Sequence, residues 1–200
     1  MTDLTAPSLV QLARNYYPEG FPITTDDHSQ DLHPYQRTPQ YTRWQEAWGR
    51  AMAWPQWTAL LREMRAVFGA STADCTQPWG TACRRCCVYF THPLPDGASL
   101  VTRVAAAASI LVPLYVTYCT TAVVAQRKQR DLTFSFEPPD EFRKDTSQLA
   151  SLVERVLGHQ PFDLRLANIP VPGVRVNYLD SSQEPTLLTA LFDNHLDNLP

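Results

Sequence analysis

The sequence predicts an α+β protein, a single domain over 1–200 in which helices pack on a mainly antiparallel sheet of about four to five strands. Three observations predict this class. Apolar residues recur at helical spacing in 1–70, strand-like runs with hairpin-length connections fill 75–137, and an amphipathic stretch covers 140–158. An edge strand and a C-terminal helix are expected in 171–200. The 200 residues, 44% of them hydrophobic, suit one domain with a sizeable core.

The N-terminal part is predicted to be helical. A short helix is expected over 8–15, and a long loop punctuated by proline follows it. Thr38 is a good N-cap residue directly ahead of a proline, which indicates the start of a longer helical stretch. The chain should break or kink at Pro55, and Gly69 should end the second helical segment.

The middle of the chain contains an uncharged run, residues 104–126, which is long enough for a membrane-spanning helix or for buried strands. A spanning helix needs about 20 mostly apolar residues and favours helix-compatible ones. This run instead has Pro113 at its centre and contains several hydroxyl-bearing and β-branched residues. We therefore expect two strands, over 100–108 and 114–124, separated at the proline.

Two further strands should flank this pair. Residues 83–91 read as a strand, and the Pro-, Asp- and Gly-rich segment 92–97 should turn the chain into a hairpin. Residues 132–136 alternate with their apolar members on one side, which predicts a half-buried antiparallel strand.

The C-terminal part should return to helices. An apolar stripe predicts a helix over 140–157, with Gly158 placed to stop it. Residues 171–178 are expected to form an edge strand because they include a proline and a glycine. Pro185 should open a last short helix.

The cysteines point to a structural role. Their number, five, is odd, which fits reduced, partly buried thiols better than a secreted disulfide framework. Cys83 and Cys86 have the spacing of a zinc-binding or redox pair. On a strand, however, these two residues point to opposite faces, and no matching second pair of ligands follows.

One segment has the composition of a metal site. Residues Asp26 to His33 include two histidines and three aspartates, which can bind a divalent transition metal, although a solvated loop facing a partner has the same composition. No serine or cysteine stands in a nucleophile signature, and no glycine-rich loop is spaced to hold a phosphate. We therefore assign no catalytic, cofactor-binding or metal-binding residue from spacing, and expect no cofactor.

Two acidic tracts flank a mildly basic helical region. No lysine or arginine lies between Arg14 and Arg37, and none follows Arg175. An ordinary solvated face is one interpretation. The other is a surface complementary to a basic protein, because opposed potentials speed encounter and disfavour wrong partners. The candidate partner-binding residues are Asp26, Asp27, Asp31, Asp180, Glu184, Asp193 and Asp197.

The net charge and the N-terminal residues indicate which partners and which cellular location to expect. The net charge of −3 comes without a clustered Lys/Arg face, so direct binding of nucleic acid is not expected. The first residues lack the basic start and apolar stretch of a secretory signal, so a cytoplasmic protein is expected. A membrane-associated protein that uses the uncharged run is the less favoured alternative.

Several segments resemble one family. The chain is similar in four segments to the bacterial immunity proteins grouped as immunity protein 52. These segments are Leu9-x-x-Leu12-x-x-x-Tyr16-Tyr17-Pro18-x-Gly20, the helical region from Trp44 to Phe68, the strand around Pro113 and the closing Pro185-Thr-Leu-Leu. The resemblance implies a non-enzymatic inhibitor of a cognate toxin, a nuclease effector delivered by type VI secretion. Such a toxin carries a basic surface that binds the phosphates of nucleic acid, and an acidic inhibitor can occupy that surface. A small metal-dependent enzyme that uses the segment Asp26 to His33 is the alternative.

Overall fold

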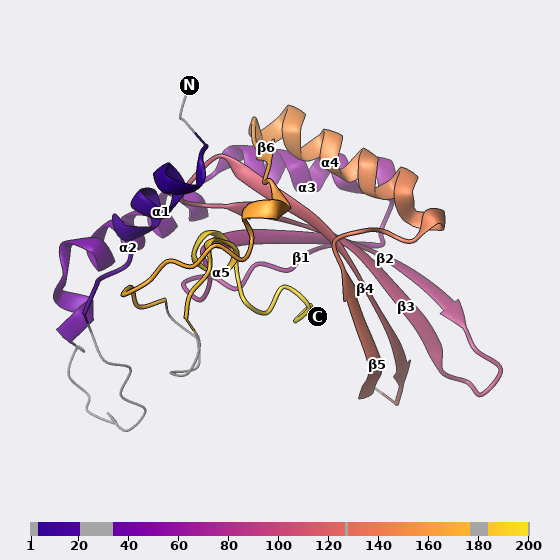
Figure 1. The fold of residues 1–200 in the computed structure, drawn as a ribbon. Helices are drawn as coiled ribbons and strands as arrows, with labels where there is room; N and C mark the ends of the chain where they lie inside the picture. The colour runs from indigo at the N-terminus through magenta and orange to yellow at the C-terminus, as the bar shows by residue number, and fades with distance from the viewer. Residues whose placement is uncertain (1–3, 21–33, 127, 177–183, 200) are drawn as a thin grey trace.

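The computed structural model describes residues 4–20, 34–126, 128–176 and 184–199. Within these residues the predicted α+β class is confirmed: helices pack on a twisted, open, mainly antiparallel sheet (Figure 1). No helix in the described ranges is long and apolar enough to cross a membrane.

The sheet is a meander in which each strand pairs with the next one along the chain, in the order β1-β2-β3-β4-β5. A short strand, β6, joins it by pairing in parallel with the start of β4. The strands are β1 (Thr72–Asp74), β2 (Cys83–Pro93), β3 (Ser99–Ser109), β4 (Leu114–Ala125), β5 (Lys128–Ser135) and β6 (Gln160–Pro161). Pro113 lies between β3 and β4, so the predicted division of the uncharged run into two strands is confirmed.

The helices begin and end where local signals place them. Their bounds are α1 (Ala6–Arg14), α2 (Pro39–Met52), α3 (Pro55–Phe68), α4 (Arg143–Leu157) and α5 (Leu187–Leu191), with short 3-10 turns at Pro34–Arg37, Asp140–Phe142 and Leu164–Leu166. The Thr38 hydroxyl accepts a hydrogen bond from the Tyr41 amide at 3.2 Å, which confirms the predicted cap of α2. Gly158 ends α4 in the left-handed conformation, with φ of 68°.

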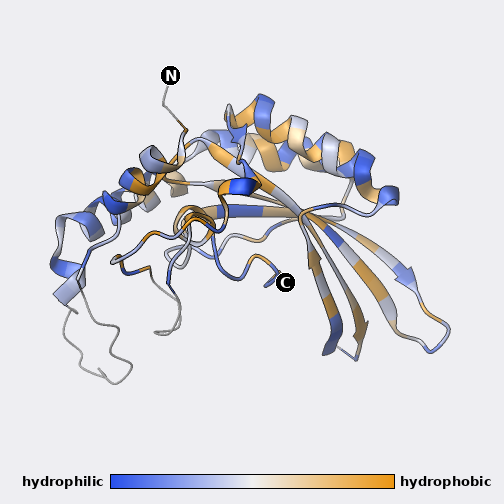
Figure 2. Ribbon diagram, viewed as in Figure 1, coloured by the Kyte–Doolittle hydropathy of each residue, from blue (hydrophilic) through white to orange (hydrophobic). Residues whose placement is uncertain are grey.

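The two faces of the sheet support two separate core clusters. Helices α3 and α4 cover one face, where Trp57, Leu60 and Leu149 are buried against Cys86 of β2. Figure 2 shows α4 banded between hydrophilic and hydrophobic residues, as a helix with one buried side should be. Helices α1, α2 and α5 contribute to the other cluster, on the face that bears Cys87 of β2. The sheet is thus covered from both sides near its centre.

One strand prediction is confirmed in its pairing and wrong in its burial. Residues 132–135 belong to β5, which pairs antiparallel with β4, but every residue of β5 is exposed, including Leu132 at 42% and Phe134 at 39%. The Phe134 side chain does lie against the sheet, since its ring centroid is 5.4 Å from that of Tyr118. However, β5 is an edge strand at the end of the meander. An alternating pattern sets which face a side chain is on, and does not determine whether another element covers that face.

The expected edge strand over 171–178, in contrast, is absent from its described part, residues 171–176, where only an isolated bridge joins Val174 to Glu19. Pro172 lacks an amide donor and Gly173 has a φ of 77°, so the backbone cannot continue a ladder there. Residues 177 and 178 lie outside the described residues.

Candidate protein-binding surface

The structure places three of the seven predicted partner-binding residues. Glu184 is exposed, Asp197 is half-buried and Asp193 is buried. The other four, Asp26, Asp27, Asp31 and Asp180, lie outside the described residues, as does the whole segment from Asp26 to His33.

The expectation that Asp193 lies on an exposed acidic surface is wrong. Its side chain is only 5% exposed, and its Oδ2 lies 3.2 Å from Nη1 of Arg85, whose side chain is completely buried. The same Arg85 nitrogen donates to the carbonyl of His195 at 3.1 Å, and Oδ1 of Asp193 accepts from the His195 amide at 3.0 Å. A buried charge needs such a partner, so this pair attaches the C-terminal segment to the sheet.

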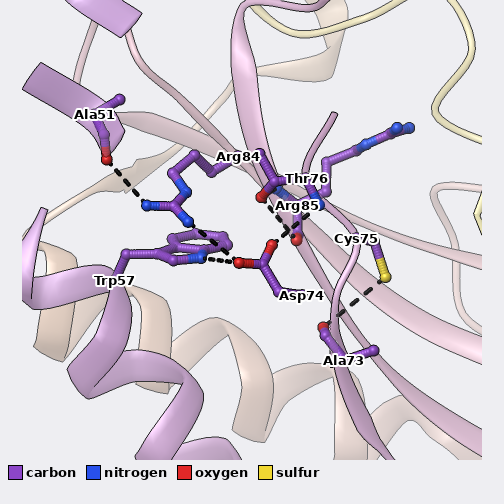
Figure 3. Close-up of polar contacts among 8 residues, drawn as sticks. All are labelled: Ala51, Trp57, Ala73, Asp74, Cys75, Thr76, Arg84 and Arg85. Atoms are coloured by element: carbon purple, nitrogen blue, oxygen red, sulfur yellow. Dashed lines mark hydrogen bonds and ion pairs between the residues drawn. The ribbon is translucent and has the colours of Figure 1, made fainter. Parts of the chain in front are cut away.

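The neighbouring arginine of β2 holds a second polar network on the opposite face (Figure 3). Oδ2 of Asp74 accepts from Nε1 of Trp57 at 3.0 Å and from Nη2 of Arg84 at 3.1 Å. The Arg84 guanidinium also lies over the Trp57 ring, 4.7 Å from its centroid, and its Nη1 donates to the Ala51 carbonyl at 2.9 Å. Arg84 therefore links β2 to the end of β1 and to α2 on one face, while Arg85 links β2 to the C-terminal segment on the other.

That connection presents an exposed tryptophan. Trp79 is 47% exposed, whereas Trp44, Trp48 and Trp57 are buried, as the helical spacing of the latter three predicts. The Trp79 backbone has a φ of 64°, a conformation that costs energy for a bulky L-residue. Its ring lies 6.0 Å from that of Trp48, so one side of the indole rests on the protein and the rest faces solvent.

A cleft of about 300 Å³ opens beside Trp79. The connection between β1 and β2 forms one wall and the C-terminal segment forms the other, and the lining residues are Gln77, Pro78, Gly80, Thr81, Asp193, His195 and Asn198. In the chain, Trp79 lies between the lining residues Pro78 and Gly80, and Asp197 lies between His195 and Asn198. A half-exposed indole beside a cleft has the features of a protein-binding site, where tryptophan often contributes the most binding energy.

Sequence reasoning missed this surface, although one signal was present. Trp79 lies between Pro78 and Gly80, outside any helical or alternating pattern, so nothing in the sequence placed it in a core. The opposite wall of the cleft comes from residues more than a hundred positions away, which no local pattern reveals.

The cysteines have structural positions. All five are buried, and none of them forms a disulfide. Cys83 belongs to one core cluster and Cys86 to the other, so the predicted opposite orientation on the strand is confirmed. Burial raises the pKa of the Cys83 thiol to about 12. In the described ranges no three or more His, Cys, Asp or Glu residues group as metal ligands would.

No protein-family model, curated protein or solved structure matches the chain.

Proposed function

We propose that this chain is an immunity protein that binds a cognate protein toxin in the cytoplasm and neutralises it without a cofactor. The expected toxin is a nuclease effector delivered by type VI secretion, as the sequence resemblance implies. The observation that best supports a binding role is the half-exposed side chain of Trp79, which has a strained backbone and lies between two residues that line the cleft. Such strain persists where the surroundings maintain it, and it often marks functional sites.

The toxin is expected to insert a loop or side chain into the cleft and to cover the Trp79 indole. Removing a tryptophan of this kind from an interface typically costs 2 kcal/mol or more, which is about a 30-fold loss of affinity. The acidic residues would act differently. Glu184 and Asp197 reach the surface and would attract the basic, phosphate-binding face of a nuclease over longer distances.

The test measures binding of the full chain to the proposed cognate toxin domain. Trp79→Ala should weaken the complex by about 30-fold or more. Met52→Ala is the matched control, because Met52 is also 47% exposed but lies on α2. Unchanged affinity for Trp79→Ala, with the native melting temperature retained, would exclude the cleft as the interface.

A charge-reversal variant tests the acidic tracts. Replacing Glu184 and Asp197 by lysine should slow association and weaken its dependence on salt. A parallel variant reverses the four predicted residues outside the described ranges, Asp26, Asp27, Asp31 and Asp180. If association rates at low and high salt match the unmodified protein for both variants, the acidic tracts do not guide the toxin.

A further inference from the structure

Two cysteines lie in contact across the first strand pair of the sheet. The Sγ atoms of Cys75 and Cys87 are 2.9 Å apart, yet both residues are free thiols. Cys87 lies on β2 opposite Ala73 of β1, and Cys75 follows β1 two residues after Ala73. The two thiols are therefore diagonal neighbours on one face of the sheet, at a separation about 1 Å greater than the length of a disulfide bond.

The surroundings distinguish the two thiols. A hydrogen bond from the Cys87 thiol is the main cause that lowers the pKa of Cys75, and the Tyr89 hydroxyl and the charge of Arg85 act in the same direction. The same hydrogen bond raises the pKa of Cys87. Cys75 is thus the thiol that ionises first, and the thiolate is the nucleophilic form of cysteine.

Solvent exposure also favours Cys75 as the thiol that an oxidant reaches first. Cys75 is 4% exposed and lies next to Asp74, an exposed residue at the end of the short strand β1. Cys87 lies within β2 and is fully covered. A small oxidant that reaches the end of β1 meets the Cys75 sulfur first.

We propose that Cys75 and Cys87 are an oxidation site, a thiol pair that hydrogen peroxide converts to a disulfide between β1 and β2 within the native fold. This proposal does not depend on toxin binding. The Cys75 thiolate attacks one peroxide oxygen, so that an S–O bond forms, the O–O bond breaks and hydroxide leaves. The Cys87 sulfur then attacks Cys75 Sγ, the S–O bond breaks, and the Cys87 proton leaves with the hydroxyl as water. Overall two thiols are oxidised and one peroxide is reduced to two waters.

The experiment counts thiols in the full chain before and after treatment with stoichiometric hydrogen peroxide. The protein is then unfolded in N-ethylmaleimide, and its intact mass is measured. The reduced chain should take up five maleimides, one for each cysteine. The oxidised chain should take up three, and dithiothreitol should restore the other two. Five maleimides after peroxide, or a loss that dithiothreitol does not reverse, would overturn the proposal.

Alanine variants identify the pair. Cys87→Ala should form no disulfide and lose at most one thiol, the Cys75 sulfenic acid, whereas Cys86→Ala should still lose two thiols, because Cys86 faces the other core cluster. If Cys87→Ala fails to fold, Cys75→Ala removes the other member of the pair and should likewise form no disulfide. Loss of two thiols in Cys87→Ala, or no loss in Cys86→Ala, would show that a different pair reacts.

Thermal unfolding tests whether the bond fits the native fold. Closing the short loop from 75 to 87 should raise the melting temperature by roughly 5 °C in the oxidised protein. An unchanged or lower melting temperature would show that the bond forms at the expense of native pairing, and would contradict the proposal.

Discussion

Removing the Asp193 carboxylate should destabilise the protein strongly, although the sequence suggested a surface role for this residue. In Asp193→Ala the Arg85 guanidinium keeps one hydrogen-bond partner among the described residues, the His195 carbonyl at 3.1 Å. Its Nε and Nη2 already lack a hydrogen-bond partner among the described residues. The variant therefore leaves a completely buried cation without a counter-charge.

Breaking a buried ion pair from one side typically costs about 3–5 kcal/mol. A chain of this size has a urea m-value of about 2 kcal/mol per molar, so the midpoint of urea unfolding should fall by roughly 2 M. The double variant Arg85→Met with Asp193→Ala should recover much of this loss, because the penalty comes from the unpaired charge rather than from the missing attraction.

Equilibrium urea unfolding, followed by tryptophan fluorescence, measures these changes. The exposed pair between Arg165 and Asp163, with Nη2 and Oδ2 2.7 Å apart, is the control. Arg165→Ala removes this pair but keeps Asp163, whose Oδ1 caps the turn at Leu164–Leu166, and it should leave the midpoint nearly unchanged, since exposed ion pairs contribute little. A loss below about 1 kcal/mol for Asp193→Ala, or a double variant less stable than the single one, would refute the reasoning.

Three further predictions concern stability. Asp74→Ala should cost about 1–2 kcal/mol in urea unfolding, because it removes the acceptor shared by Trp57 and Arg84; an unchanged midpoint would contradict this. Gly158→Ala should cost about 1 kcal/mol because its φ of 68° disfavours a Cβ, and a stabilised variant would contradict that reason. Stability should fall as pH rises from 9 toward 12, since the pKa of Cys83 is raised from 9.0 to about 12 and the unfolded thiol ionises first. The slope for this one thiol is about 1.4 kcal/mol per pH unit, and Cys83→Ala should reduce the measured slope by that amount.

Local signals in the sequence were sufficient to place most elements. The cap at Thr38, the breaks at Pro55 and Pro113 and the stop at Gly158 each depend on the backbone chemistry of one or two residues, and all four are confirmed. Strands β1 and β6 were missed because pairings of two or three residues depend on a neighbouring strand rather than on their own composition.

The candidate site depends on contacts between residues far apart in the chain, so less of it can be predicted from sequence patterns. A count of acidic residues does not show that Asp193 meets Arg85, because that contact joins β2 to a segment more than a hundred residues later. The cleft beside Trp79 has the same long-range origin. Glu184 and Asp197 do reach the surface, but charge patterning alone did not separate them from Asp193.

The segment after α1 is joined to residues near the other end of the described chain. The Tyr17 hydroxyl donates to the Ala190 carbonyl at 2.8 Å, and the Gly20 amide donates to the Gly173 carbonyl at 3.1 Å. During translation these partners do not yet exist when α1 leaves the ribosome. The meander can form earlier, because its strands pair with their sequence neighbours. Helix α1 should therefore dock late, and Leu9 should stay uncovered until the segments around Gly173 and Ala190 have been made.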